Sequence, residues 1–243
     1  MNPKMLPLVF LFFSCMVSLI WIQVGQTKIK NQWELGSSFE VRGIDLSHHN
    51  GQINYNELDS IDFVFLKASE GTTLIDKTFS KHHKEFSEKK IAIGAYHFFR
   101  FDTDGKEQAI HFLKNVEGKK LQLPLIVDVE QDNNPYIEKN IVIKRLHSFI
   151  REIKKQTGIK PIIYTNGDGY SKYIEDDFSE HQLWLSSTNS WRPSLIDCTF
   201  WQFNIEGNLS AISQNVDLNV FRGSRQDWQD YLQKNKPFLV NIQ

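Results

Sequence analysis

The stretch Leu123-Pro-Leu-Ile-Val-Asp-Val-Glu130 is the most informative part of this chain, because an apolar run typical of a buried strand ends in two acids. Side chains two positions apart on a strand point to the same face, so Asp128 and Glu130 are predicted to project side by side, roughly 6–7 Å apart. Neighbouring carboxylates in a low dielectric repel, which raises the pKa of one of them. Such a pair suits a general acid for glycoside cleavage. Two solvated acids, or two ligands of a divalent metal ion, are the alternatives that this stretch leaves open.

Strand-like and helix-like segments alternate over the rest of the chain, which predicts an α/β fold with a parallel sheet. The predicted strands are mostly continuous apolar runs, as expected when both faces of a sheet are covered: Val41–Ser47, Phe63–Ala68, Ile91–Phe99, Leu123–Glu130, Pro161–Thr165, Gln182–Ser186, Thr199–Phe203 and Val216–Phe221. The predicted helices are Thr78–Lys89, Gly105–Val116 and Asn140–Thr157, the last ending at a capping Gly158. Eight strands and a helix-poor C-terminal third indicate an irregular TIM-like β/α barrel. An open doubly wound sheet is the alternative, but no Gly-rich phosphate loop supports it.

Two further strands carry acids that a closed barrel would bring to the same place. Asp45 ends the first strand, in Gly43-Ile-Asp-Leu-Ser-His-His-Asn-Gly51, and Asp217 lies on the last, in Asn215-Val-Asp-Leu-Asn219. The first and last strands of a closed barrel are neighbours, so both acids are predicted to meet Asp128 and Glu130 at one end of the barrel. Four converging acids reduce stability, which favours a functional explanation.

Histidines near these acids raise the possibility of a metal site. His48, His49 and His97 together with carboxylates are suitable ligands for a divalent ion. The sequence nevertheless lacks a His-x-His strand motif and a His-Glu-x-x-His helix motif. No metal ion and no cofactor are therefore predicted, and loss of activity in EDTA would favour the metal interpretation.

Other polar and aromatic residues near strand ends are candidates for substrate contact. Tyr96 and His97 end the third strand, and Glu70 follows the second in Lys67-Ala-Ser-Glu-Gly71. A strand histidine is commonly structural, but the adjacent tyrosine and the acids favour a position in the binding groove. His82 and His83 are expected on a surface helix without a functional role.

The N-terminal 28 residues differ from the remainder in composition. Residues 5–24 are uncharged and largely apolar, which is longer than a usual signal-peptide core and long enough to span a bilayer. We expect an uncleaved signal anchor at 1–28, a short polar tether at 29–40 and one catalytic domain at 41–243. The protein is accordingly expected to be exported and membrane-anchored, facing the periplasm or cell exterior, with secretion after cleavage as the alternative.

Composition restricts the partners of the exported domain. The formal net charge is −1 and basic blocks are absent, which argues against nucleic acid as a partner. The two cysteines, Cys15 and Cys198, form neither a disulfide framework nor a zinc site. The sequence carries no signal for an oligomer, and a monomer is expected.

Taken together, the motifs resemble glycoside hydrolase family 25, the Chalaropsis-type lysozymes (N-acetylmuramidases). The similar stretches occur in the order of the family and cover about 180 residues: GIDLSHHNG (43–51), FVFLKASEG (63–71), IGAYHFFR (93–100), LPLIVDVE (123–130), PIIYTN (161–166), LWLSS (183–187), WQF (201–203) and VDLNVF (216–221). The resemblance implies a flattened, irregular β/α barrel. It further implies cleavage of the β-1,4 bond between N-acetylmuramic acid and N-acetylglucosamine in peptidoglycan glycan strands.

The resemblance also implies roles for individual residues. Glu130 matches the general acid/base of the family, Asp128 its paired aspartate, Asp45 and Asp217 the remaining acids, and Tyr96 a groove tyrosine. Tyr164, Trp184 and Trp201 lie in matching stretches and are further candidates for substrate binding. The chain departs from the family at Thr188, where tyrosine is usual, and at Phe203-Asn204, where Tyr-Thr is usual. Both departures concern the groove lining and therefore saccharide preference.

A retaining mechanism is expected. Asp128 and Glu130 lie on one strand, so they are poorly placed to form the facing pair that a direct carboxylate nucleophile would use. The substrate's 2-acetamido oxygen is then a better nucleophile than a carboxylate, with Asp128 stabilising the amide and Asp45 or Asp217 sharing that role. Two alternatives stay open: a non-catalytic cell-wall-binding module, and a glycosidase that acts on chitin-like N-acetylglucosamine polymers.

Overall fold

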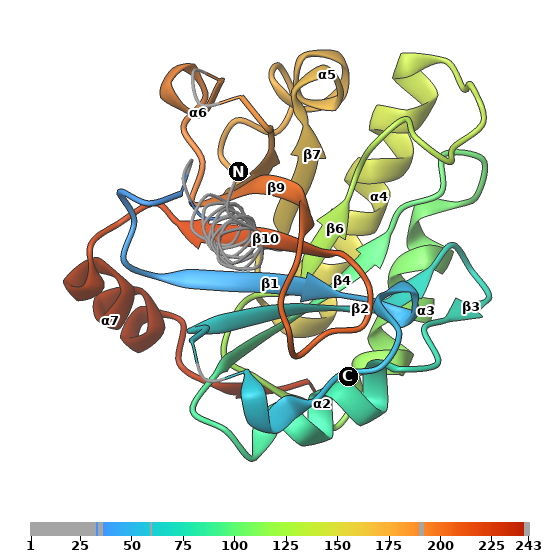
Figure 1. The fold of residues 1–243 in the computed structure, drawn as a ribbon. Helices are drawn as coiled ribbons and strands as arrows, with labels where there is room; N and C mark the ends of the chain where they lie inside the picture. Colours follow the sequence, from blue (N-terminus) through green and yellow to red (C-terminus); the bar gives the residue numbers. More distant parts are fainter. Residues whose placement is uncertain (1–32, 34–35, 59, 190–191, 241–243) are drawn as a thin grey trace, which may run out of the picture.

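Eight strands of the protein close into a barrel (Figure 1). The structure, a computed structural model, describes residues 33, 36–58, 60–189 and 192–240 of the 243-residue chain. The barrel closes because β1, at one end of the sheet, also pairs with β2 near the other end. This arrangement confirms the predicted barrel, whose strands follow one another in the order β1 (Arg42–Leu46), β10 (Val216–Phe221), β9 (Phe200–Gly207), β8 (Leu183–Ser186), β7 (Ile162–Asn166), β6 (Ile126–Asp128), β4 (Ala92–Phe98) and β2 (Phe63–Glu70).

Every predicted strand is present, and the largest difference in length concerns Leu123–Glu130. Only Ile126–Asp128 of this segment forms a strand, β6. Pro124 has no backbone N–H to offer a neighbouring strand, which agrees with the late start. Glu130 lies beyond the end of the strand, although the Val129 N–H still donates to the carbonyl of Tyr164 at 2.9 Å.

Strand direction determines which residues reach the end of the barrel that we call the mouth. The strands β1, β2, β4, β6, β7, β8 and β9 run parallel, and their C-terminal ends form the mouth. Strand β10 runs antiparallel to both of its neighbours, so its N-terminal end lies there instead. In this register Asp45 of β1 pairs directly with Asp217 of β10.

Helix α2 (Phe79–Ser87) lies at the bottom of the barrel in the view of Figure 1, and α3 (Gly105–Val116) and α4 (Lys139–Thr157) lie on its right-hand side. They match the predicted helices closely, and Gly158 ends the third with a φ of 72°, the left-handed conformation that glycine adopts without strain. The remaining third is helix-poor except for α7, which the sequence analysis did not assign and which begins at a Ser224–Asp227 capping box. The helices are α2 (Phe79–Ser87), α3 (Gly105–Val116), α4 (Lys139–Thr157), α5 (Gly167–Gly169), α6 (Arg192–Leu195) and α7 (Arg225–Lys234).

Several shorter elements complete the chain. Strand β3 (Leu74–Ile75) pairs with β2, while β5 (Lys120–Leu121) pairs with β11 (Phe238–Leu239) in a separate sheet. Short helical turns of other types are η1 (His48–Asn50), η2 (Tyr55–Glu57) and η3 (Tyr170–Ile174).

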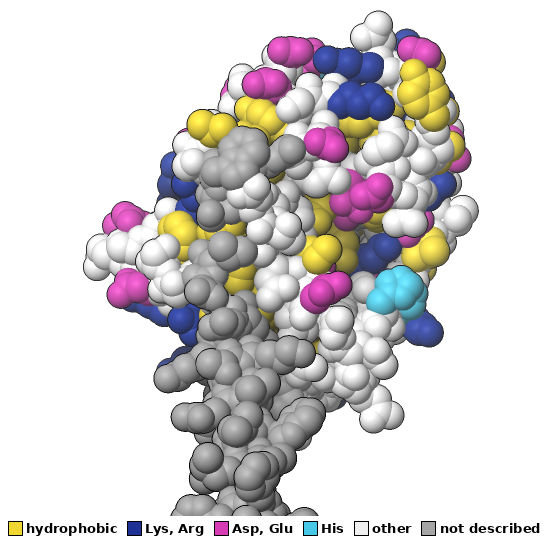
Figure 2. Space-filling model, turned by 45° about the horizontal axis from the view of Figure 1, so that its top comes forward, with side chains coloured by type: hydrophobic (Ala, Val, Ile, Leu, Met, Phe, Trp, Pro, Cys, Tyr) yellow, Lys and Arg dark blue, Asp and Glu magenta, His cyan; other side chains and the backbone are white. Residues whose placement is uncertain are grey.

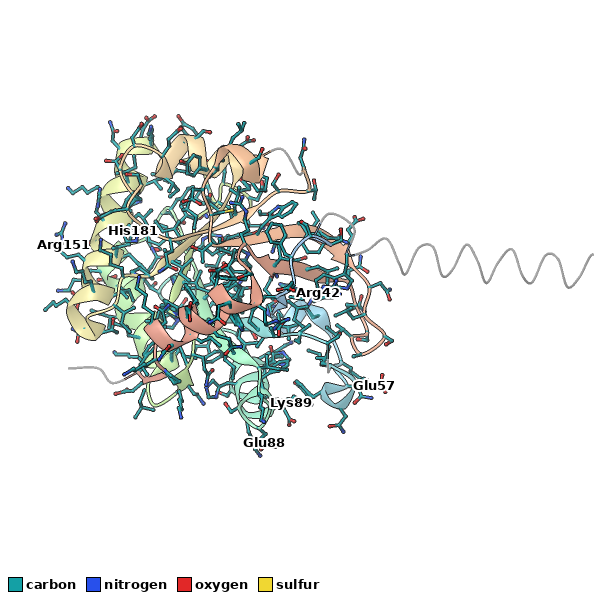
Figure 3. The ribbon with its side chains drawn as sticks, turned by 90° about the vertical axis from the view of Figure 1, so that its left-hand side faces the viewer. Arg42, Glu57, Glu88, Lys89, Arg151 and His181 are labelled. Atoms are coloured by element: carbon teal, nitrogen blue, oxygen red, sulfur yellow. The ribbon has the colours of Figure 1, made fainter. Side chains whose placement is uncertain are left out.

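Two hydrophobic layers hold the barrel together. The inner layer is aromatic: the rings of Phe65 and Trp184 lie 4.4 Å apart, and Trp228 of α7 packs 5.6 Å from Phe63. The outer layer lies between the sheet and the helices. Charged side chains such as those of Glu57, Glu88 and Arg151 project from the periphery (Figure 3). Because the inner layer fills the barrel, side chains at the strand ends lie outside this layer, at the mouth.

Two of the histidines expected on a helix surface are buried instead. His82 and His83 belong to the buried face of α2. The Tyr55 hydroxyl lies 2.7 Å from Nδ1 of His82, and Nε2 of His83 lies 3.0 Å from the carbonyl of Lys120. Burial lowers the pKa of His82 to about 4, so both roles are structural.

The N-terminal expectations fall largely outside the described residues. The apolar stretch 5–24 is not among them, and within the part of the chain that the structure does describe, no helix is long and apolar enough to cross a membrane. Part of the expected tether packs on the barrel, since Phe39 lies 6.3 Å from Trp201 and Trp33 lies 5.6 Å from Phe203 between ring centroids.

Candidate active site

Three of the four predicted acids project from barrel strands at the mouth. Asp128 ends β6, Asp45 lies near the end of β1, and Asp217 lies near the start of β10. Strand alternation points them inward, because Val127 and Val129 on either side of Asp128 pack in the outer hydrophobic layer. Glu130, two positions further on, faces the same way and interacts electrostatically with Asp128 and Asp45. The structure therefore brings the four acids together.

Asp45 and Asp217 form a hydrogen-bonded pair with two amides. The Gln202 side chain donates to Oδ2 of Asp45 at 2.9 Å and to Oδ2 of Asp217 at 3.2 Å, while Asn219 donates to Asp45 at 2.8 Å. Burial raises the pKa of Asp45 to about 6, and these donors limit the rise. Burial together with the charge of Asp45 raises the pKa of Asp217 to about 9. At neutral pH this pair therefore shares one proton.

Glu130 is the acid best suited to titrate near neutral pH. Burial raises its pKa to about 7, and the charges of Asp132 and Asp45 act in the same direction. Asp132 is not among the acids predicted from the sequence, although it lies only two residues after Glu130. Burial, and then the charge of Glu130, raises the pKa of Asp128 well above its usual range. Within the described part of the chain, Oδ1 of Asp128 is buried without a hydrogen-bond partner.

Aromatic residues form the floor of the site. Tyr164 donates from its hydroxyl to the side-chain oxygen of Gln202 at 2.8 Å and lines the pocket described below. Trp184 is fully buried under it, with ring centroids 4.4 Å apart, and donates from Nε1 to Asn219 at 2.7 Å. Tyr96 is also buried and packs edge-on against Trp184 at 6.1 Å. Trp184 thus holds the amide that binds Asp45, which corrects the expectation that it contacts substrate directly.

Two predicted substrate-binding residues face away from the mouth. His97 is completely buried in the outer layer, where its ring stacks on Phe149. Its Nδ1 lies 2.9 Å from Oγ of Ser69. Trp201 points outward as well and donates from Nε1 to the carbonyl of Ser187 at 2.8 Å. The reason is alternation: His97 follows the inward Tyr96, and Trp201 precedes the inward Gln202. Neither residue is a groove residue, which corrects the sequence-based expectation.

A basic side chain that the sequence analysis did not consider lies near the acids. Lys67 of β2 donates to Glu70 at 2.9 Å and lies 5.0 Å from the ring centroid of Phe98. Burial raises the pKa of Asp128 and of Glu130, and the positive charge of Lys67 opposes both rises. Glu70 is half-buried and contacts Lys67 and Arg100 rather than an open groove.

An open pocket of about 640 Å³ lies at the mouth. Acidic side chains gather near the middle of the face shown in Figure 2, with a basic side chain and apolar atoms between them. Among the described residues, no three His, Cys, Asp or Glu side chains are arranged to hold a metal ion. Thr188, one of the departures from the family, is part of the lining, which comprises Glu130, Asp132, Tyr164, Asn166, Gly167, Asp168, Ser186, Ser187, Thr188, Asn189, Gln202, Ile205 and Asp217.

The raised pKa of Asp217 predicts a pH-dependent loss of stability that Asp217→Asn should remove. Between about pH 4 and pH 9 the unfolded chain ionises this group and the folded chain does not, so its contribution to stability is lost as pH rises. Asn resembles the protonated acid and keeps an acceptor for Gln202. We expect the free energy of unfolding to increase by at least about 1 kcal/mol at pH 7, and not below pH 4.

Urea unfolding of both proteins at pH 3.5 and pH 7 measures this effect. Asp176→Asn is the control, because Asp176 is an exposed acid whose side chain is 75% accessible; its expected change is below about 0.5 kcal/mol. An equal gain at both pH values would contradict the electrostatic explanation.

The fold and the site together define a barrel enzyme whose pocket is lined by carboxyl groups. The family model described as "Glycosyl hydrolases family 25" matches residues 44–212, and the chain belongs to this family of glycoside hydrolases. Over 201 residues it is 28% identical to Lysozyme M1 of Streptomyces globisporus, covering 76% of this chain and 68% of that protein.

Solved structures show the same similarity. A family 25 glycosyl hydrolase from Bacillus anthracis superposes with a TM-score of 0.71 at 33% identity, covering 80% of this chain and 94% of that one. The bacterial lysozyme from Streptomyces coelicolor superposes with a TM-score of 0.69 at 26% identity, covering 81% and 98%.

Proposed function

We propose that the protein is an N-acetylmuramidase that hydrolyses the β-1,4 bond between N-acetylmuramic acid and N-acetylglucosamine of peptidoglycan. Family membership and similarity to proteins named lysozyme and N,O-diacetylmuramidase support this substrate. The proposed chemistry rests on Glu130. This acid lines the pocket beside a second buried acid, Asp128, and burial raises the pKa of Glu130 to about 7. A carboxyl group that is still about half protonated at pH 7 is suited to protonate a glycosidic oxygen.

In the first step, Glu130 gives its proton to the leaving oxygen as the bond to the anomeric carbon breaks. The acetamido oxygen at C2 of the same sugar attacks that carbon and forms a cyclic oxazolinium ion. The acetamido N–H donates to Asp128, whose buried Oδ1 is otherwise without a partner within the described residues. A hydrogen bond to the ionised form lowers the pKa of Asp128, so binding favours a negative Asp128 and leaves the proton on Glu130.

In the second step, the ionised Glu130 removes a proton from water, whose oxygen attacks the anomeric carbon. The acetamido group is released and Glu130 is protonated again. Two inversions at one carbon give overall retention of configuration. The hydrogen-bonded Asp45–Asp217 pair contributes a partly negative surface near the positive intermediate.

Mass spectrometry of fragments released from purified peptidoglycan by the full chain tests this proposal. Fragments that end in reducing N-acetylmuramic acid are expected, and NMR of the earliest product should show the β-anomer. Reducing N-acetylglucosamine ends would refute the bond assignment. Cleavage of chitin alone would point to the alternative substrate, and binding to peptidoglycan without cleavage would indicate a recognition module.

The raised pKa of Glu130 predicts how activity responds to pH. Because the protonated acid is required, kcat/KM should fall as pH rises through about 7, the value for the free enzyme. Asp132→Asn removes one of the charges that raise this pKa. The fall in kcat/KM on the alkaline side of the pH–rate profile (the alkaline limb) should therefore move to lower pH. Rates of glycan release between pH 4 and pH 9 measure both profiles, and a limb that does not respond to Asp132→Asn would contradict the assignment.

We also propose that the protein is exported, because peptidoglycan lies outside the cytoplasmic membrane and residues 5–24 form an uncharged apolar stretch. Fractionation of cells that express the full chain distinguishes an anchored form, in the membrane fraction, from a cleaved one in the medium. Retention in the cytosol would refute export.

A further inference from the structure

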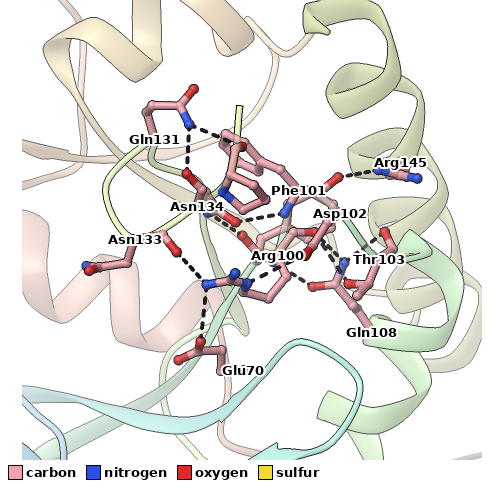
Figure 4. Close-up of polar contacts among 12 residues, drawn as sticks. Glu70, Arg100, Phe101, Asp102, Thr103, Gln108, Gln131, Asn133, Asn134 and Arg145 are labelled. Carbon is pink, nitrogen blue, oxygen red and sulfur yellow. Dashed lines mark hydrogen bonds and ion pairs between the residues drawn. The ribbon is translucent and has the colours of Figure 1, made fainter. Parts of the chain in front are cut away.

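One asparagine side chain, Asn134, makes three hydrogen bonds in the segment that follows Glu130 (Figure 4). Its amide nitrogen donates to the carbonyl of Glu130 at 2.9 Å and to the carbonyl of Phe99 at 3.0 Å. Its amide oxygen accepts from the Phe101 N–H at 2.8 Å. One side chain therefore joins the backbone of Glu130 to the loop that follows β4, using both donors and the acceptor of its amide.

Other contacts hold the same turn from two further directions. Arg100 donates to the carbonyl of Asn133 and lies 3.6 Å from the carboxylate of Glu70 at the end of β2. On the opposite side, the oxygen of the Gln131 side chain accepts from the Tyr173 hydroxyl at 2.8 Å. Asn133 has a positive φ of 63°, so the backbone turns sharply here, and the Asn134 N–H donates to the carbonyl of Gln131 at 3.0 Å.

This support is important because Glu130 lies outside the strand ladder. The last backbone contacts that tie the strand to β7 involve Val129, whose N–H donates to the carbonyl of Tyr164 and whose carbonyl accepts from Thr165 Oγ1 at 2.7 Å. Among the described residues, Asn134 donates the side-chain hydrogen bond that holds the backbone carbonyl of Glu130. Displacement of a reacting group by about 1 Å can cost about 100-fold in rate.

We propose that Asn134 is a positioning residue that fixes the backbone of Glu130 and thereby places its carboxyl group against the scissile bond. This inference depends on the proposed function for the role of Glu130, whereas the hold on the backbone is a property of the loop itself. Asparagine is suited to this position because aspartate, though similar in shape, lacks the two N–H donors. A carboxylate there would place oxygen against the carbonyls of Glu130 and Phe99.

The experiment compares the wild type with Asn134→Ala and Asn134→Asp. Both variants are expected to lose about 10–100-fold in kcat on peptidoglycan, with KM within about twofold. In Asn134→Asp the added charge should also raise the pKa of Glu130, next to Asp132, Asp45 and Lys67, and move the alkaline limb to higher pH. The control is Asn115→Ala, which removes an amide that donates to the carbonyl of His111 on α3.

Backbone amide hydrogen exchange, followed by mass spectrometry, gives a readout independent of activity. Asn134→Ala should exchange faster in residues 130–134 while peptides from the barrel strands keep wild-type rates. Unchanged exchange in this segment would overturn the proposal, as would a kcat within twofold of the wild type. If the wild type cleaves no glycan, the proposed function fails, and exchange alone then decides whether Asn134 holds the loop.

Discussion

Replacing Glu130 by Gln is expected to reduce kcat on peptidoglycan by about 10³-fold or more while the protein stays folded. The glutamine amide fills the same volume and cannot give a proton to the leaving oxygen, and general acid–base catalysis contributes about 10²–10⁴-fold. Since burial raises the pKa of Glu130 to about 7, its removal should leave thermal stability at pH 7 unchanged or higher. Release of muropeptides, measured by mass spectrometry over time, gives the rate.

A matched control is Glu138→Gln, an exposed acid eight residues further along the chain. Its kcat should stay within about twofold of the wild type. Near-normal cleavage by Glu130→Gln would refute the assignment of the general acid and direct attention to Asp128 or Asp217. Loss of folding by circular dichroism would make the variant uninformative, in which case Glu130→Asp, which keeps an acid but shortens it, provides the comparison.

The positions of the four acids could be predicted from sequence because each follows from strand geometry. Asp45 and Asp128 lie at the ends of apolar runs, and parallel strands place such ends at one mouth. Asp217 required one more fact, closure of the barrel, which its register with Asp45 confirms. Helix boundaries were similarly accessible, because periodic apolar positions and Gly158 mark them.

The errors in the site have a common physical cause, the two-residue alternation of strand side chains. The sequence-based prediction places both Tyr96 and His97 in the groove, yet adjacent residues on a strand cannot face the same side, and His97 packs on Phe149. The same alternation applies to Trp201, which is predicted to line the groove but faces outward, whereas the next residue, Gln202, faces inward. Alternation lets only one residue of each adjacent pair face the groove, and the register of the paired strands determines which one.

Other features depend on tertiary contacts that no local pattern specifies. The sequence does not predict Lys67 as a site residue, because a lysine within a strand motif gives no indication of which acids it approaches. The amides of Gln202 and Asn219 bind Asp45 only after β10 pairs with β1 and β9 pairs with β10. Asn134 acts through the carbonyls of Glu130 and Phe99, which are 4 and 35 residues away, and such a pairing requires the folded loops.

Replacing Asp128 by Asn is expected to reduce kcat by about 10²–10³-fold, for a reason different from that for Glu130. Asparagine can accept from the acetamido N–H, but it supplies no negative charge to the oxazolinium ion. Because burial and the charge of Glu130 raise the pKa of Asp128, the variant should also unfold at a higher temperature at pH 7. A control is Asp176→Asn, which changes an exposed acid outside the pocket lining and should leave kcat within about twofold of the wild type.

A substrate with an activated leaving group separates the two roles. A nitrophenyl glycoside needs little protonation, so Glu130→Gln should recover most of its rate in the first step on this substrate, while Asp128→Asn should not. Replacing the substrate's acetamido group by trifluoroacetamido weakens its oxygen as a nucleophile and should slow the wild type strongly. If Asp128→Asn recovers on the nitrophenyl glycoside and the fluorinated substrate reacts normally, the acetamido oxygen is not the nucleophile, and an enzyme carboxylate must take that role.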